Sequence, residues 1–375
     1  MRRTLVLAVV VFAAMAIHGT ASAQPLDPAK LEYLGAFRPP GDFVWMNGGI
    51  GFYPAGNGGV GSMISFGHDW QDNLGEYTIP DPVNFKKKAD GFVYGDLTVA
   101  GVIKAPAPSN PPDEPNAGGP SAEYLADIDK VVYGSNGYGA SHGYSDVGGT
   151  NPQGPWALTG IDMRRVGHYI CEISPDWATA NLPAGQVCTT GFNWAQYGRG
   201  PDLYAYDPDS PDGNSTLPAT KLIEYSGSAP WAEWDMDDYW GGSAWVETVG
   251  SGSAVILAGR KDTTNMGNDT NAADEFHPWL LLYDPDVLAE VAAGAKTPSE
   301  PVPYQQVDLT DLYFGNGMGF DAGAYDRANN ILYIQEDEST TAVIHAFQVI
   351  PEPATMGMLA LGFAGLAVLR RRSSQ

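Results

Sequence analysis

Short apolar runs separated by turn residues dominate the hydrophobic pattern of this chain. Residues 62–66, 254–258, 279–283 and 331–335 are examples, and each is too short for a stable helix. Helical periodicity is confined to residues 174–180 and 287–295, which follow Ser-Pro and Asp-Pro starts. The pattern therefore predicts an all-β fold with two short helices.

A tyrosine followed by a turn recurs at the ends of these runs. It occurs at Tyr53, Tyr206, Tyr283 and Tyr325, at intervals of 153, 77 and 42 residues. These intervals are close to multiples of about 40 residues, the length of one β-propeller blade. The sequence predicts a propeller of about seven blades, with six to eight as the range and a pair of β-sandwiches as the alternative. We expect the first strand, 31–37, or the last, 343–349, to complete a shared blade, because a propeller protects its sheet edges only when the ring closes.

Composition supports short strands and limits the partners. The 375 residues include 46 Gly and 29 Pro, which favour turns, and 42 aromatic residues, which supply a large apolar area. The net charge is −24, and no run of Lys and Arg exceeds three residues. A nucleic-acid partner is therefore not expected.

The N-terminus has the features of a secretory signal peptide. Two arginines precede an apolar run over residues 5–14, and Ala21 and Ala23 provide small residues before a predicted cleavage site at Gln24. The apolar run is too short to cross a bilayer. We therefore expect signal peptidase to remove residues 1–23 and the chain to be exported.

The C-terminus combines three elements in order. The motif Pro351-Glu352-Pro353 opens residues 351–355, an apolar stretch covers 356–369, and Arg370, Arg371 and Arg372 follow. This arrangement closely resembles the PEP-CTERM sorting signal of Gram-negative bacteria, which the membrane protease exosortase recognises. The resemblance implies a transient membrane helix with the arginines on the cytoplasmic side, cleavage near the motif, and a final location at the cell surface or in a polysaccharide matrix.

The two cysteines are expected to pair. An oxidising destination favours a disulfide between Cys171 and Cys188 over a metal site or a nucleophile. On the chain-entropy account, closing a loop of this length contributes about 3 kcal/mol.

The body, residues 24–350, resembles a group of secreted bacterial propeller-like proteins. The matching segments include LEYLGAFRPP, GHYICEISPDW, YGRGPDLYAYDP and HPWLLLYDPDVLAEVAAG. This resemblance supports the fold and export, and it supplies no catalytic residue.

Residues 231–240 are the most site-like stretch of the sequence. They combine Trp231, Trp234 and Trp240 with four carboxylates, of which Asp235, Asp237 and Asp238 are the candidate polar contacts. Indole faces stack on sugar rings and carboxylates hydrogen-bond to hydroxyls, so the segment predicts a glycan site. The alternative is an inter-blade loop whose tryptophans fill cores.

Other motifs carry weaker signals. Residues 56–61 match GxGxxG, but a strand-like run follows, so we expect a hairpin turn rather than a dinucleotide site. The five histidines of the body are scattered, and His68 beside Asp69 is the best candidate for a ligand contact.

A calcium site is a weaker hypothesis. Asp207, Asp209 and Asp212 form an Asp-rich turn that departs from the EF-hand register, so an ordinary hairpin turn is the simpler interpretation. Segments 271–275 and 235–238 are equally loose alternatives.

Two functions remain open from the sequence. The first is a non-enzymatic exported surface or matrix protein that binds a polysaccharide, a surface protein or Ca²⁺. The second is a carbohydrate-active hydrolase or lyase on the propeller face near Trp234, Asp235, Asp237 and His68. Convergence of a histidine, an arginine such as Arg199 or Arg260, and two carboxylates at the central mouth would favour the enzyme.

Overall fold

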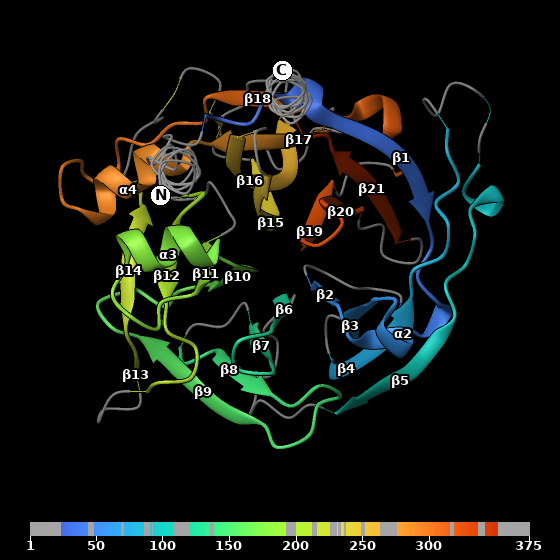
Figure 1. Cartoon of the computed structure of the whole chain (residues 1–375), viewed down its shortest axis with the longest axis horizontal. Helices are drawn as coiled ribbons and strands as arrows, with labels where there is room; N and C mark the ends of the chain where they lie inside the picture. The colour runs from blue at the N-terminus through green and yellow to red at the C-terminus, as the bar shows by residue number, and fades with distance from the viewer. Residues whose placement is uncertain are drawn as a thin grey trace, which may run out of the picture.

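The chain forms a five-bladed β-propeller (Figure 1). This computed structural model describes residues 24–43, 49–68, 71–85, 91, 93–108, 121–135, 139–192, 200–211, 216–225, 231, 234–235, 238–248, 252–262, 276–315, 319–336 and 342–351. Within these ranges, five twisted sheets stand around one central axis. The prediction of a propeller is confirmed, and the prediction of seven blades is wrong.

Four blades follow one another along the chain, and the first strand of each lies next to the axis. The blades, each written from the axis outward, are β2 (Ile50–Tyr53), β3 (Ser62–His68), β4 (Gln71–Thr78) and β5 (Val102–Pro108); β6 (Ser121–Leu125), β7 (Lys130–Gly134), β8 (His142–Ser145) and β9 (Gln153–Leu158); β10 (Val166–Glu172), β11 (Cys188–Phe192), β12 (Leu203–Tyr206) and β14 (Ala219–Ile223); and β15 (Tyr239–Thr248), β16 (Gly252–Asp262), β17 (Phe276–Tyr283) and β18 (Gln305–Asp308). Strand β13 (Thr216–Leu217) leaves its own blade and pairs in parallel with β9.

The fifth blade joins the two ends of the chain. Strands β19 (Phe320–Asp326), β20 (Ile331–Glu336) and β21 (Val343–Val349) form its inner part, and β1 (Leu31–Phe37) adds the outermost strand. β1 runs antiparallel to β21, with Leu31 opposite Val349 and Phe37 opposite Ile344. Figure 1 shows this pair as the blue and dark red ribbons side by side. The expected closure of the ring by the terminal strands is confirmed.

Five hydrophobic clusters fill the five gaps between neighbouring blades. The side chains along β16 alternate between two of these clusters. Val255 and Leu257 face the blade of β10, whereas Ala254, Ile256 and Ala258 face the closing blade. Successive side chains of a strand point to opposite faces, so every sheet is buried on both sides.

The two predicted helices are present, and they begin at the expected Ser-Pro and Asp-Pro pairs. α3 (Pro175–Asn181) is capped by the Ser174 side chain, and α4 (Pro285–Ala292) by that of Asp284; both have Pro at the first helical turn. Short 3₁₀ turns lie at Pro28–Lys30, Gly41–Phe43, Tyr94–Asp96 and Thr310–Leu312.

The GxGxxG segment is a turn, as predicted. It forms the single-turn α2 (Gly56–Gly59) between the antiparallel strands β2 and β3, with Asn57 and Gly58 at positive φ. No βαβ unit follows it, so it has no dinucleotide geometry.

The blade count was wrong because the repeated tyrosines do not occupy equivalent positions. Tyr53 and Tyr325 lie at or near the ends of inner strands, whereas Tyr206 and Tyr283 end the third strands of their blades. Their spacing therefore mixes different strand positions and does not measure the length of a blade.

The predicted disulfide is wrong, since Cys171 and Cys188 are free and buried. In the ladder between β10 and β11, Cys171 lies opposite Thr189, and Cys188 lies opposite Glu172. This offset of one residue sends the two thiols to opposite faces of the sheet. Cys171 packs in the cluster toward β15 and Cys188 in the cluster toward β9.

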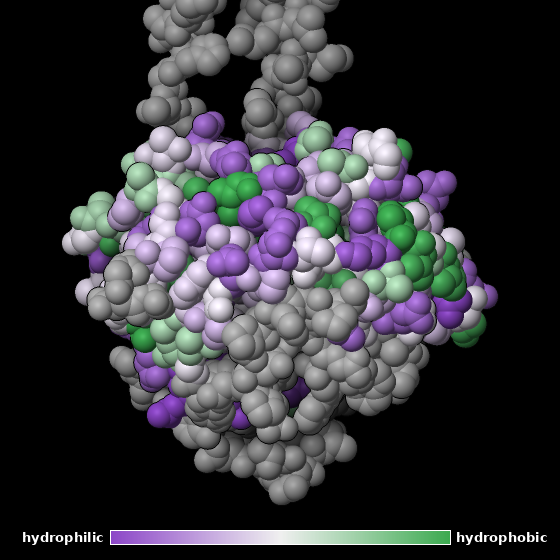
Figure 2. Space-filling model, turned by 90° about the horizontal axis from the view of Figure 1, so that it is seen from below, coloured by the Kyte–Doolittle hydropathy of each residue, from purple (hydrophilic) through white to green (hydrophobic). Residues whose placement is uncertain are grey.

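The described surface carries no broad apolar face on the side seen in Figure 2, where hydrophilic side chains surround small hydrophobic groups. None of the described helices is long and apolar enough to cross a membrane. The signal peptide (1–23), residues 352–375 and the proposed membrane helix (356–369) lie outside the described residues.

We expect Phe37→Ala in β1 to destabilise the protein strongly. Phe37 is fully buried in the cluster between the closing blade and the blade of β2, so its truncation should lower the free energy of unfolding by about 3–5 kcal/mol. The exposed Glu32 on the same strand provides the control, and Glu32→Ala should change stability by no more than about 0.5 kcal/mol. Equal effects of the two variants in a urea titration would contradict closure by β1.

Both thiols should react only after unfolding. Burial raises the pKa of Cys171 to about 11 and that of Cys188 well above its ordinary value, so neither forms a thiolate at neutral pH. Iodoacetamide should leave the native mass unchanged and add two carbamidomethyl groups in denaturant without reductant. A denatured chain that reacts only after reduction would establish the disulfide instead.

Candidate functional site

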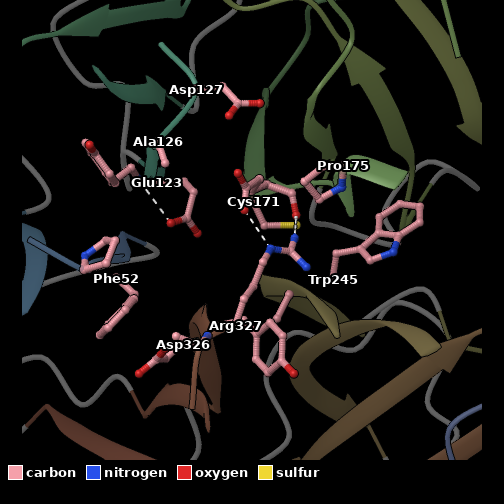
Figure 3. A pocket seen from close by; sticks show the side chains of 15 residues that line it. Phe52, Glu123, Ala126, Asp127, Cys171, Pro175, Trp245, Asp326 and Arg327 are labelled. Carbon is pink, nitrogen blue, oxygen red and sulfur yellow. Dashed lines mark hydrogen bonds and ion pairs between the residues drawn. The ribbon is translucent and has the colours of Figure 1, made fainter. Parts of the chain in front are cut away.

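A cavity of about 320 Å³ lies where the inner strands meet at one end of the axis (Figure 3). All five blades contribute to its wall. The contributing residues include Phe52 of β2, Glu123 of β6, Cys171 and Glu172 of β10, Trp245 of β15, and Arg327 directly after β19.

The cavity has an exposed rim and a buried floor. Pro54, Asp127 and Ala328 at the rim are exposed. On the floor, Phe52 and Trp245 are only 8% and 1% exposed. A small hollow with aromatic walls and a few polar groups is typical of sites that bind one small molecule.

An ion pair crosses the cavity. Arg327 Nε donates to Glu172 Oε2 at 2.7 Å, and Arg327 Nη2 donates to the backbone oxygen of Glu172, also at 2.7 Å. The guanidinium carbon lies 5.7 Å from the centre of the Tyr325 ring. The blades of β19 and β10 are not neighbours, because the blade of β15 stands between them. The pair therefore connects two blades across the axis.

The turn after β19 fixes the position of Arg327. Asp326 Oδ1 accepts hydrogen bonds from the backbone N–H groups of Ala328 and Asn329, at 3.0 and 3.1 Å, and Asp326 Oδ2 accepts from the Asn329 side chain at 2.7 Å. An Asp that closes a turn in this way holds the backbone of the following residue. Arg327 consequently starts at the rim and reaches inward, as Figure 3 shows.

Glu123 also lines the cavity, and the environment of its carboxyl group differs from that of Glu172. Its side chain is almost fully buried, and its Oε1 accepts from the Tyr124 N–H at 3.1 Å. Burial raises the pKa of Glu123 well above its ordinary value, and the negative charge of Glu172 raises it further. The cavity thus contains a buried carboxyl group with a raised pKa, an ion-paired carboxylate and a guanidinium, together with the carboxyl groups of Asp127 and Asp326.

The described residues of the Trp-rich segment, 231, 234–235 and 238–240, do not line this cavity. Trp240 is fully buried in the core, and Asp238 is buried in an ion pair with Lys261 at 2.8 Å, so the predicted contacts at these two residues are wrong. Trp231 and Trp234 are half-buried, and the Trp234 indole donates to Gly200 O at 2.9 Å. Ligand contacts at Trp231, Trp234 and the half-buried Asp235 stay predictions, and Asp237 lies outside the described residues.

The structure places no histidine in the described wall of the cavity. His142 and His168 are buried, and desolvation lowers the pKa of each to about 3, so both are neutral. His345 is buried between Glu336 and Tyr33 in the closing blade. The backbone of His68 lies at the end of β3, opposite Gln71, and its side chain is not described.

Calcium binding stays a prediction. Asp207 and Asp209 lie in one turn, where Asp207 Oδ1 accepts from the Asp209 N–H at 3.3 Å, and Asp212 and residues 271–275 lie outside the described part. Among the described residues, no group of three or more His, Cys, Asp or Glu side chains is arranged to hold a metal ion.

One further sequence pattern has a structural explanation. Residues 139–143, GASHG, fit the GxSxG pattern of serine hydrolases, which is functional on a sharp turn between a strand and a helix. Here Ser141 directly precedes strand β8, is 4% exposed, and donates to Val166 O at 3.0 Å. It is therefore a structural serine.

Sequence reasoning did not select Glu123, Glu172 and Arg327, three of the polar residues that line the cavity. One signal pointed to Arg327: the tyrosine turns at Tyr206 and Tyr283 read Tyr-Asp-Pro, whereas the turn at Tyr325 reads Tyr-Asp-Arg. Proline at that position has no donor, and arginine has five. Arg199, one of the two arginines expected at the mouth, lies outside the described residues, and Arg260 stacks on Phe276 at 4.2 Å.

Comparison with known proteins identifies the C-terminal segment. Residues 349–372 match the family described as the PEP-CTERM protein-sorting motif. The chain therefore carries the sorting signal of an exported protein of Gram-negative bacteria that exosortase processes. A search of curated proteins found no match to this chain.

Several solved structures resemble the chain at low identity. A candidate glycoside hydrolase from Parabacteroides distasonis shares 13% identity with a TM-score of 0.45, covering 89% of this chain and 95% of its own. A candidate glycosidase from Bacteroides thetaiotaomicron shares 11% with a TM-score of 0.43, covering 88% and 95%. An auxiliary nutrient-binding protein from the same organism shares 11% with a TM-score of 0.32, covering 76% and 56%.

Proposed function

We propose that this exported protein binds a carbohydrate in its axial cavity and acts at the cell surface or in the extracellular matrix. One observation carries the proposal. One small cavity, built by all five blades, combines aromatic walls with four carboxyl groups and a guanidinium.

The chemistry of the wall suits a polyhydroxylated ligand. Sugar hydroxyls both donate and accept, so they can pair with the Glu172 carboxylate, the Glu123 carboxyl group and the Arg327 donors. Aromatic faces such as that of Phe52 pack against the C–H faces of a sugar ring. The volume of about 320 Å³ suits one small ligand rather than a long segment of polymer.

Processing completes the proposed route to the surface. Signal peptidase would cut before Gln24, residues 356–369 would anchor the chain transiently with Arg370–Arg372 on the cytoplasmic side, and exosortase would cut near Pro351-Glu352-Pro353. A glycan-binding domain would then be released where a polysaccharide matrix is assembled.

A carbohydrate-active hydrolase at the same cavity is the second candidate function. The observation in its favour is the contrast between the buried Glu123, whose pKa is raised, and the ion-paired Glu172 carboxylate. In such a reaction the glycosidic C–O bond breaks and Glu123 gives its proton to the leaving oxygen. Water then adds to the anomeric carbon, and its released proton passes to Glu172.

We expect Arg327→Ala to reduce glycan binding by tenfold or more, because it removes both the cross-axis pair and the donors of the cavity. The test is a glycan array on the full chain followed by calorimetry with the best soluble sugar, with Arg164→Ala, an exposed arginine distant in sequence, as the charge-matched control. Unchanged affinity in Arg327→Ala would exclude the cavity as the site. Release of reducing sugar that Glu123→Gln abolishes would establish the hydrolase, and binding without release would establish the binder.

The protonation of Glu123 predicts a specific pH dependence of stability. The folded chain holds this proton more tightly than the unfolded chain, so unfolding releases it once pH exceeds about 4.5. Its contribution to the free energy of unfolding therefore falls as pH rises toward the raised pKa, by up to about 1.4 kcal/mol per pH unit. Asp127, Glu172, Asp326 and Arg327 are the charged residues that line the cavity together with Glu123.

Glu123→Gln should remove this part of the slope, since glutamine does not titrate. The measurement is urea unfolding of wild type and variant from pH 4.5 to 8, with the exposed Glu32→Gln as the control. Parallel curves for wild type and Glu123→Gln would show that Glu123 is ionised in the folded protein.

A further inference from the structure

We propose that the end of the propeller that contains the cavity, here called the cavity face, lies against the membrane surface while the sorting signal is attached. Cleavage near Pro351-Glu352-Pro353 then exposes the cavity to the matrix. This inference rests on the transient anchoring in the proposed function and adds an order of events, because a polymer reaches the cavity only after processing.

The last strand of the closing blade ends at the cavity face. β20 runs antiparallel to β19, and β21 runs antiparallel to β20, so β21 and β19 point the same way. β19 ends at the cavity, where Asp326 and Arg327 line the wall. Val349, the last residue of β21, therefore lies at the same end of the axis, and the exposed Pro351 follows two residues later. The chain consequently leaves the domain toward its sorting signal on the cavity face.

The first residues after the predicted signal peptide lie at the same face. Gln24 O accepts from the Ser253 N–H at 2.9 Å, and the Leu26 N–H donates to Ser253 O at 3.0 Å. Ser253 belongs to the turn that connects β15 to β16. The end of β15 lies beside the cavity wall, since Glu247 O accepts from the Tyr325 hydroxyl at 3.2 Å. Both ends of the domain therefore open on the cavity face.

The segment between the domain and the proposed membrane helix is short. Five peptide steps lead from Pro351 to the start of the apolar stretch 356–369, and a fully extended chain covers at most about 18 Å in five steps. β19 and β21 have seven residues each, which makes the closing blade about 24 Å tall. The tether is thus shorter than the blade. An anchored chain can bring its cavity face to the bilayer but cannot turn the opposite end toward it.

The cavity face also carries negative charge. Asp127 and Asp129 are exposed in the turn after β6, and Asp176 is exposed at the start of α3. A bilayer that contains anionic lipids repels such a surface. Only the covalent tether then keeps the face near the membrane, so cleavage allows the domain to leave and opens the cavity.

The experiment measures how fast single introduced cysteines react with a long poly(ethylene glycol) maleimide. Asp127→Cys and Ala328→Cys place a thiol at exposed positions of the cavity rim. Ala140→Cys is the control at the opposite end, because β7 runs away from the rim turn and β8 begins where β7 ends. The native thiols are buried and should not react.

Two forms of the chain are compared. Residues 24–375 are placed in phosphatidylcholine nanodiscs, and residues 24–351 are mixed with empty nanodiscs. The shorter form keeps every hydrogen bond described in the closing blade, including that from the Ile350 N–H to Lys30 O. Circular dichroism identifies variants that fail to fold, and the second rim position decides the test if the first variant fails.

We expect both rim cysteines to react at least fivefold more slowly in the anchored form than in the shorter form. The rate at Ala140→Cys should be the same in the two forms. N-ethylmaleimide should react at the rim with a smaller difference, because a small reagent enters between the domain and the bilayer.

The other results have separate meanings. Equal rates in the two forms at all three positions, or slowing confined to Ala140→Cys, would overturn the inference and leave the proposed carbohydrate binding standing. Failure of residues 24–375 to co-migrate with the nanodiscs would overturn the inference together with the anchoring. Sugar binding is measured separately on residues 24–351, so its absence would refute the proposed binding without changing the result for the orientation.

Discussion

The pairing of β1 with β21 is the interaction on which the propeller depends. Each sheet has two apolar faces and can bury them only against its two neighbours, so an open row of blades would expose the faces at its ends. Residues from opposite ends of the chain form the closing ladder, with Tyr33 opposite Phe347. A buried polar chain reinforces it, since the Tyr33 hydroxyl lies 3.1 Å from His345 Nδ1 and His345 Nε2 lies 3.0 Å from Glu336 Oε2. Such a network is satisfied only when strands β1, β21 and β20 are all in place.

Closure of the ring also creates the candidate site. The cavity takes residues from all five inner strands, so no blade contains it alone. Glu172 and Arg327 belong to two blades that are separated by the blade of β15. The distance of 2.7 Å between Arg327 Nε and Glu172 Oε2 therefore depends on how the blade of β15 packs between them. Stability and site geometry are therefore linked: a substitution that loosens one inter-blade cluster changes the distance across the axis as well as the free energy of unfolding.

Much of the fold could be predicted from the sequence, and the failures have physical causes. Short apolar runs such as residues 254–258 and the Pro-initiated helices are local features, so their pattern identified them correctly. The intervals between the tyrosines give the number of blades only if each tyrosine ends the same strand of its blade. The pairing of the two cysteines depends on a one-residue offset between β10 and β11. The spacing of residues along the sequence determines neither property. The site was missed for a similar reason. Glu123 lies in an ordinary short strand, and only the closed ring brings it near Glu172 and Arg327, whereas the concentrated tryptophans of residues 231–240 proved partly to be core.

The position of the sorting signal is compatible with the closing blade. Val349 is the last residue of the β21 ladder, and the Ile350 N–H donates to Lys30 O at 2.9 Å. Pro351 follows directly, is exposed, and has no N–H to donate. Loss of the residues after Pro351 would therefore remove none of the hydrogen bonds described in the closing blade. An exported chain that depends on its terminal strands for closure can thus be processed at its C-terminus without opening the ring, because the ladder ends before the motif begins.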